Sequence, residues 1–133
     1  KTLKICRTNS HKLGVGNRLK LYKSNIDNFY LGKYDLIVSN PPYIKKNDLK
    51  CLEKDIKFEP IQALDGGVDG LSELNKVIDK SAKLIKTKGC LILEIGIDQK
   101  NKVKRILQKK GFYIKKVVKD LSNHDRCIVS IKL

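Results

Sequence analysis

Hydrophobic positions along the chain alternate between short continuous runs and helical spacing, a pattern that predicts an α/β fold. Two runs rich in β-branched residues, 34–39 and 90–95, have the length and character of buried parallel strands. Between them, residues 71–86 repeat apolar positions near helical spacing, and Gly89 is a natural stop signal. A second helix is predicted after the strand at 90–95, from Asp98 to a terminating glycine at position 111.

The two ends of the chain add further elements to this pattern. Residues 2–13 are predicted to form a helix, and residues 19–22 alternate in the manner of a short strand. Residues 112–118 and 126–133 predict two last strands, and the short polar link between them favours antiparallel pairing. This order of elements predicts an α/β sandwich with a mostly parallel sheet and a C-terminal antiparallel strand pair.

A long irregular stretch, residues 44–69, interrupts the regular elements. Loops of this length inside a compact domain are usually functional or disordered. The stretch ends in a glycine-rich segment that contains Gly66 and Gly67 and continues to Gly70. These glycines are explained equally well as loop punctuation and as residues that shape a substrate channel. Asp69 is interpreted as a helix cap rather than as a catalytic residue.

The most informative stretch is Asn40-Pro41-Pro42-Tyr43, which directly follows the strand at 34–39. Each proline lacks a backbone N–H, so this loop offers carbonyl acceptors and almost no donors. Because Asn40 precedes a proline, its backbone is held extended, which fixes the direction of its side chain. The Asn40 side-chain oxygen and the Pro41 carbonyl then form a rigid acceptor pair beside the ring of Tyr43. Such a pair suits a planar NH2 group.

Charge and composition bound the partners of the chain. The 133 residues carry 25 Lys, 4 Arg and a formal net charge of +15. This balance favours a polyanionic partner such as nucleic acid or the ribosome, although a general lysine bias would give the same composition.

The four cysteines show no spacing typical of a metal site, and we predict that the protein holds no metal. Free thiols are typical of the reducing cytosol, so a cytoplasmic location is expected. The sequence shows neither a signal peptide nor an apolar run of membrane-spanning length, and no membrane association is predicted.

The loop after the strand at 34–39 resembles the Asn-Pro-Pro-Tyr element of methyltransferases that act on amino groups with S-adenosylmethionine. Residues 35–44 as a whole are similar to the signature of the HemK/PrmC type, the peptide chain release factor glutamine methyltransferases. Further matches to that type extend the resemblance over nearly the whole chain: Glu59-Pro60, Ala63-Leu64, Gly67, Asp69-Gly70-Leu71, Leu93-Glu94-Ile95-Gly96 with Gln99, Gly111-Phe112, Asp120-Leu121 and Asp125-Arg126.

This resemblance implies a Rossmann-like S-adenosylmethionine methyltransferase sheet. It also implies methyl transfer to the side-chain amide nitrogen of the glutamine in the Gly-Gly-Gln motif of a peptide chain release factor. The implied site residues fall into three groups: Asn40, Pro41 and Tyr43 as catalytic residues, these three with Pro42 and Glu59 as substrate-binding residues, and Asn25, Ile26 and Asn40 as cofactor-binding residues. Glu94 has two possible roles, a general base and a structural carboxylate, and the structural role is favoured.

The chain departs from the family pattern in one respect. The glycine-rich cofactor loop of the family, the acidic residue that holds the ribose and the preceding recognition domain are not found in it. We therefore expect residues 1–133 to be the C-terminal part of a single catalytic domain that lacks the first strands of its sheet. Two alternatives stay open at this point, an amino-group methyltransferase of DNA or RNA and an inactive fragment.

Overall fold

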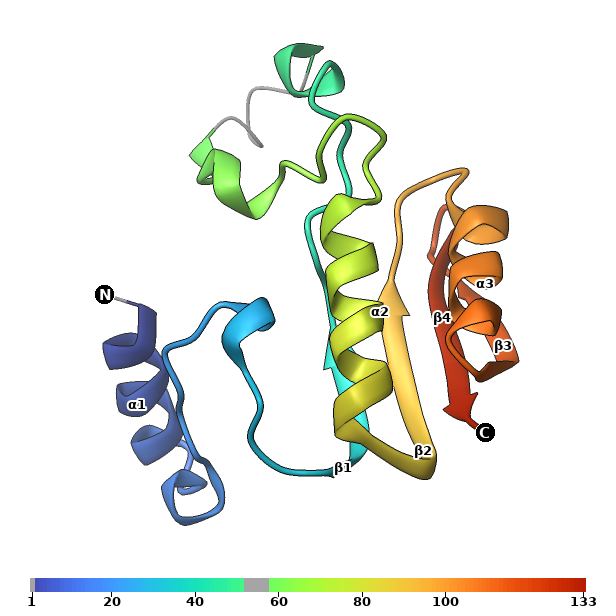
Figure 1. Cartoon of the computed structure of the whole chain (residues 1–133). Coiled ribbons are helices and arrows are strands. Elements are labelled where there is room, and N and C mark those ends of the chain that lie inside the picture. The colour runs from blue at the N-terminus through green and yellow to red at the C-terminus, as the bar shows by residue number, and fades with distance from the viewer. Residues whose placement is uncertain (1, 52–57) are drawn as a thin grey trace.

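Four strands form one mixed sheet in the computed structural model, which describes residues 2–51 and 58–133 (Figure 1). Their spatial order is β1-β2-β4-β3. β1 and β2 pair in parallel, whereas β4 is antiparallel to both of its neighbours, so β1, β2 and β3 all run in the same direction. The predicted α/β class and the antiparallel C-terminal pair are confirmed. The strands are β1 (Tyr34–Ser39), β2 (Ile85–Glu94), β3 (Phe112–Lys119) and β4 (Asp125–Lys132).

Two amphipathic helices pack on the sheet, and both were predicted from the hydrophobic spacing. Helix α2 (Ser72–Leu84) contacts β1 and β2, helix α3 (Lys100–Lys109) contacts β3 and β4, and the two helices contact each other (Figure 1). The strand β2 begins at Ile85, five residues earlier than predicted, directly at the end of α2. Burial of apolar side chains between helices and sheet stabilises the fold by about 1.5–3 kcal/mol for each large side chain. The core includes Leu74, Ile78, Leu91, Leu93, Ile95, Val103, Leu107, Phe112 and Ile128.

The N-terminal segment is packed much less closely. Helix α1 (Thr2–Lys12) is confirmed, but it lies away from the sheet and contacts only the short 3-10 turn η1 (Gly16–Arg18) substantially (Figure 1). The strand predicted at residues 19–22 is wrong, because those residues form no regular structure. A strand needs a hydrogen-bonding partner, and β1, the nearest edge of the sheet, pairs only with β2. A second 3-10 turn, η2 (Ile26–Asn28), leads into β1.

The predicted irregular stretch 44–69 leaves the sheet after β1 and returns to α2. It contains the 3-10 turns η3 (Asp48–Cys51) and η5 (Ile61–Ala63), and residues 52–57 lie outside the described part. A bridge between Ile44 and Asp65 joins its two ends next to the sheet. Within residues 2–51 and 58–133, no helix combines the length and the apolar character that crossing a membrane requires.

Candidate active site

The Asn-Pro-Pro-Tyr loop lies at the carboxyl end of β1, where ligands bind in open α/β sheets. A cavity of about 260 Å³ opens there. All five residues that the sequence assigned to substrate binding line this one cavity: Asn40, Pro41, Pro42, Tyr43 and Glu59. The long loop therefore returns Glu59 to the end of β1, a proximity that spacing along the chain does not reveal.

At its first residues, the loop presents acceptors. Asn40 is exposed, whereas Pro41 behind it is buried. No hydrogen bond within residues 2–51 and 58–133 engages the Asn40 side chain or the Pro41 carbonyl. The two prolines have no N–H of their own to donate to these oxygens. Both oxygens therefore remain available to a ligand that brings donors into the cavity.

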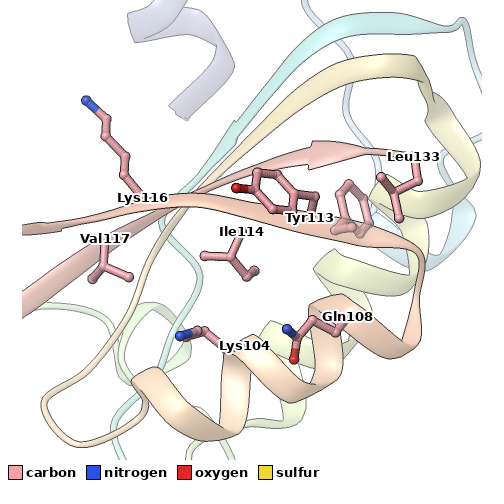
Figure 2. Close-up of a pocket in the computed structure, with 8 residues that line it drawn as sticks. Lys104, Gln108, Tyr113, Ile114, Lys116, Val117 and Leu133 are labelled. Carbon is pink, nitrogen blue, oxygen red and sulfur yellow. The ribbon is translucent and has the colours of Figure 1, made fainter.

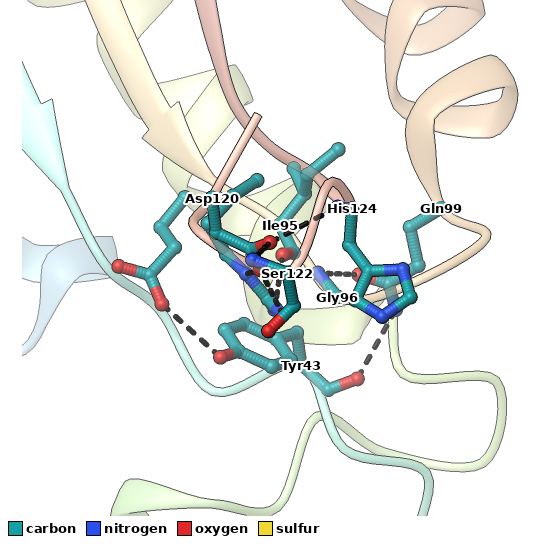
Figure 3. A network of polar contacts seen from close by, with 9 residues as sticks. Tyr43, Ile95, Gly96, Gln99, Asp120, Ser122 and His124 are labelled. Carbon is teal, nitrogen blue, oxygen red and sulfur yellow. Dashed lines mark hydrogen bonds and ion pairs between the residues drawn. The ribbon is translucent and has the colours of Figure 1, made fainter. Parts of the chain in front are cut away.

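At its last residue, the loop is held by the protein. The Tyr43 hydroxyl donates a hydrogen bond of 3.1 Å to Glu94 Oε1 at the end of β2 (Figure 3). Burial raises the pKa of the Tyr43 phenol, and the hydrogen bond and charge of Glu94 add to this effect. The phenol is therefore a neutral donor at physiological pH. The structure favours the structural explanation of Glu94, because its carboxylate fixes the Tyr43 ring.

Gln99 connects this loop to two other segments. Its Nε2 donates to the Tyr43 carbonyl (3.1 Å), and its Oε1 accepts from the Gly96 N–H (2.8 Å) (Figure 3). Nε2 also donates to the Gly70 carbonyl (3.0 Å). The residue is only 7% exposed, so these bonds lie away from competing water. One amide side chain thus joins the Asn-Pro-Pro-Tyr loop, the glycine-rich segment and the turn between β2 and α3.

Two glycines of the long loop pack directly against Tyr43. A Cβ atom at Gly66 would lie 2.8 Å from the Tyr43 backbone, and one at Gly70 would lie 2.5 Å from the Tyr43 carbonyl oxygen. Gly70 also has a φ of +74°, which other residues rarely adopt. Gly66 and Gly70 therefore pack closely against the candidate site, a role beyond the two explanations that the sequence left open.

Arg126, on β4, supports the same corner from the other side. It forms an ion pair of 3.0 Å with Asp120, donates to the Ile95 carbonyl (3.1 Å), and lies 6.0 Å from the centroid of the Tyr43 ring. Backbone N–H groups of the turn, first that of His124, lower the pKa of the Asp120 carboxyl, and Arg126 adds to the effect. The Asp120 carboxylate therefore stays charged and holds the guanidinium in place.

The three residues assigned to the cofactor do not share a cavity. Asn40 lines the cavity described above, whereas Ile26 packs against the core and lines a separate cavity of about 290 Å³ beside β1 and α2. Asn25 is exposed, precedes the turn η2 and lines neither of the two. The described residues therefore fit only part of an S-adenosylmethionine site.

Sequence reasoning assigned no role to Gln99 or Arg126, although both fall within the blocks that carry the family resemblance. The signal that could have found them is their match to the family pattern. Gln99 follows the end of β2 and Arg126 lies at the start of β4, both distant from the Asn-Pro-Pro-Tyr loop in sequence. Only the fold shows that these strand ends meet the loop.

Comparisons with known proteins give consistent results. No profile of a known protein family matches the chain. A release factor glutamine methyltransferase of Clostridium acetobutylicum is 33% identical over 134 aligned positions, which span 98% of this chain and 47% of that protein. One from Clostridium botulinum is 38% identical over 130 positions, 95% of this chain and 46% of that protein. A bifunctional methyltransferase of Rickettsia prowazekii is 40% identical over 129 positions, 95% of this chain and 25% of that protein.

Solved structures show the same fold at low sequence identity. TrmN from Thermus thermophilus superposes with a TM-score of 0.66 at 18% identity, over 98% of this chain and 33% of that one. A ribosomal protein L11 methylase from Lactobacillus delbrueckii gives 0.66 at 17% identity, over 98% of this chain and 53% of that one. The chain spans about half the length of the first two curated relatives. With its Rossmann-like methyltransferase fold, it belongs to the family of release factor glutamine methyltransferases.

Proposed function

We propose that the chain binds the side-chain amide of a glutamine and holds it for methylation on nitrogen. The substrate is the glutamine of the Gly-Gly-Gln motif in a peptide chain release factor. One observation carries this proposal: Asn40 and Pro41, whose side-chain oxygen and carbonyl have no partner in the described structure, line a cavity beside a fixed aromatic ring. Both Clostridium relatives are named release factor glutamine methyltransferases, which agrees with this substrate.

The chemistry of a primary amide matches these groups. Its NH2 has two hydrogens, which Asn40 and Pro41 accept, and its flat face packs on the Tyr43 ring. An amide nitrogen is a poor nucleophile because its lone pair is delocalised. Accepting both hydrogens increases the electron density on nitrogen and fixes its direction, and such positioning supplies much of the acceleration in a group transfer. Glu59, the one carboxylate among the described residues that line the cavity, accepts an N–H of the bound peptide.

When bound, S-adenosylmethionine would supply the electrophilic methyl group and keep the electron pair of the broken S–CH3 bond, and the amide nitrogen would release one proton to solvent. Asn25 would accept from the adenine amino group, and Ile26 would pack on the ring. Because the described residues fit only part of this cofactor, and the relatives are about twice as long as the chain, we assign its other contacts to the additional part of those relatives.

A chimera provides the test. The part of the Clostridium botulinum relative that precedes the matched region is fused ahead of Lys1, and cofactor binding is measured first by calorimetry. The chimera is then incubated with a purified release factor and methyl-labelled cofactor. We expect label on the Gly-Gly-Gln glutamine, and none in the same chimera with Asn40→Ala.

Three outcomes of this assay contradict the proposal. The first is a chimera that binds the cofactor and leaves the release factor unlabelled. The second is label on naked ribosomal RNA or DNA, offered in parallel, in preference to the release factor. That second result would favour a nucleic-acid base as the substrate. Label on the glutamine that survives Asn40→Ala would move the site of binding away from the loop.

A further inference from the structure

Positive charge is concentrated on one pair of packed elements. Residues 100–119, which form α3 and β3, include eight Lys, one Arg and no Asp or Glu. This segment of twenty residues supplies nine of the fifteen excess positive charges of the chain. Solvent-exposed surfaces usually intersperse charges of both signs. The absence of acidic residues from α3 and β3 therefore needs an explanation other than solubility.

Most of these cations have no counterion. Within residues 2–51 and 58–133, the ion pairs of this segment are Lys100 with Asp125 and Lys110 with Asp79. Seven other cations form no ion pair in the described part of the chain, and six of them are exposed, Lys104 being half-buried. These seven are Lys102, Lys104, Arg105, Lys109, Lys115, Lys116 and Lys119.

An open groove of about 600 Å³ lies between the two elements. Lys104 and Gln108 of α3 form one side, and Ile114 of β3 points toward them, while Lys116 extends from β3 in another direction (Figure 2). Tyr113 also lines the groove and is 60% exposed. The groove thus has Lys104 on its α3 side, and Lys116 and an accessible aromatic ring belong to its β3 side.

We propose that this α3–β3 surface binds single-stranded nucleic acid. The lysines contact phosphates, and a base stacks on Tyr113. A basic groove that tracks the backbone, together with an aromatic stacking surface, is the usual arrangement for such ligands. Lysine is a compact point charge that positions phosphates without reading sequence, so the binding is sequence-tolerant and weakens with salt. An acidic protein segment would use the lysines but would have no base to place on the ring.

The test measures binding of fluorescent oligonucleotides of about 12 residues, oligouridine and oligothymidine, by anisotropy at about 50–200 mM salt. The groove variant is Lys104→Glu with Lys116→Glu. Its control is Lys20→Glu with Lys23→Glu, which changes the net charge equally at exposed positions outside the groove. We expect the groove variant to lose at least about tenfold in affinity and to reduce the slope of log affinity against log salt by about 1.4, since each phosphate contact on a single strand contributes about 0.7.

Tyr113→Ala is expected to weaken binding about tenfold, because stacking of one base has that magnitude. Tyr113→Phe, which keeps the flat ring, is expected to restore it. Thermal unfolding of every variant is compared with that of the unaltered chain. If the charge reversals unfold the protein, Lys104→Gln with Lys116→Gln replaces them, with Lys20→Gln and Lys23→Gln as the matched control.

Equal losses in the groove and control variants would overturn the proposal, because net charge alone would then drive the binding. Tighter binding of a polyglutamate peptide than of both oligonucleotides would also overturn it and favour an acidic protein partner. Equal binding of RNA and DNA supports a single-stranded nucleic acid of either kind, and preference for oligouridine identifies RNA. None of these outcomes depends on methyl transfer.

Discussion

Asn40 and Tyr43 lie three positions apart in one loop, but their surroundings differ sharply. The Tyr43 end is bound by Glu94 and Gln99 and packed against glycines, so that nearly every polar group there has a partner. The Asn40 end offers oxygens that nothing in the described structure engages. Pro41 is buried, and the carbonyl of a buried residue usually has a partner, so its lack of one in the described structure needs an explanation. The comparison separates a scaffold end of the loop from the end at which we propose that the ligand binds.

The largest effect on stability is expected at the scaffold end, from Gln99→Leu. Leucine fills a similar volume but leaves the Tyr43 and Gly70 carbonyls and the Gly96 N–H without partners. Because each unsatisfied buried group costs about 1–3 kcal/mol, we expect the free energy of unfolding to fall by about 3–5 kcal/mol. Urea denaturation measures this, with exposed Gln108→Leu as the control, for which we expect a change within about 0.5 kcal/mol. Equal effects of the two substitutions would show that the hydrogen bonds of Gln99 do not stabilise the fold.

Gly70→Ala comes next. The added Cβ meets the Tyr43 carbonyl oxygen, and alanine is strained at positive φ, so we expect a loss of about 2–3 kcal/mol in the free energy of unfolding. Gly14→Ala is a matched control, because Gly14 also has positive φ (+67°) but no atom within 4 Å of the added Cβ. We expect that control to lose only about 1 kcal/mol. The difference between the two losses in the free energy of unfolding measures the cost of the Cβ contact with Tyr43. Equal losses would show that this contact does not affect stability.

Tyr43→Phe removes one hydrogen bond and keeps the ring. We expect a loss of about 1 kcal/mol in the free energy of unfolding. Exposed Tyr113→Phe is the control, with no measurable loss expected. The pKa of Tyr43 is raised in the folded protein, so this contribution is complete below the ordinary phenol value near 10 and declines as pH rises through the folded value. If Tyr43→Phe were neutral, the bond to Glu94 would contribute nothing to the scaffold.

Asp120 holds Arg126 beside Tyr43, and we expect a smaller effect on stability, confined to acid pH, when Asp120 is replaced. Its pKa is lowered in the folded state, mainly by the His124 N–H, so its contribution is complete above the ordinary carboxyl value near 4 and is lost as pH falls through the lowered value. We expect Asp120→Asn to flatten the decline of the melting temperature in this window. Identical pH profiles for the variant and the unaltered chain would contradict this role of Asp120.

The sequence predicted the Asn40 end of the loop better than the Tyr43 end. Periodicity identified α2, α3 and three of the four strands closely. The strand at 34–39 was expected to be buried, and this was wrong, because β1 lies at the edge of the sheet and leaves Leu36 and Val38 exposed (53% and 65%). The donor-poor chemistry of Asn40-Pro41-Pro42-Tyr43 was also readable locally, because it depends on the missing N–H of proline. Periodicity failed at residues 19–22, where alternation alone supplied no strand to pair with.

The supports of Tyr43 were not predictable in the same way. Gln99 is distant from Tyr43 in sequence, and a glutamine at a helix start has no local feature that predicts two carbonyl partners in other segments. For Gly70, the sequence left loop punctuation and a role in shaping a substrate channel equally open, and only the structure places the Tyr43 carbonyl where its Cβ would lie. Long-range contacts of this kind follow from topology, which spacing along the chain does not specify.

The most direct test of the proposed function is whether Asn40 binds the NH2 group of a primary amide. A Gly-Gly-Gln peptide labelled with ¹⁵N in the glutamine side chain is titrated with the chain and with Asn40→Ala, and the NH2 resonances are followed by NMR. Because the Asn40 side chain is exposed and makes no hydrogen bond within the described structure, we expect the free energy of unfolding of the variant to lie within about 0.5 kcal/mol of that of the unaltered chain. We predict that the two NH2 signals shift with the unaltered chain and stay in place with Asn40→Ala. Equal shifts with both proteins would contradict the central claim.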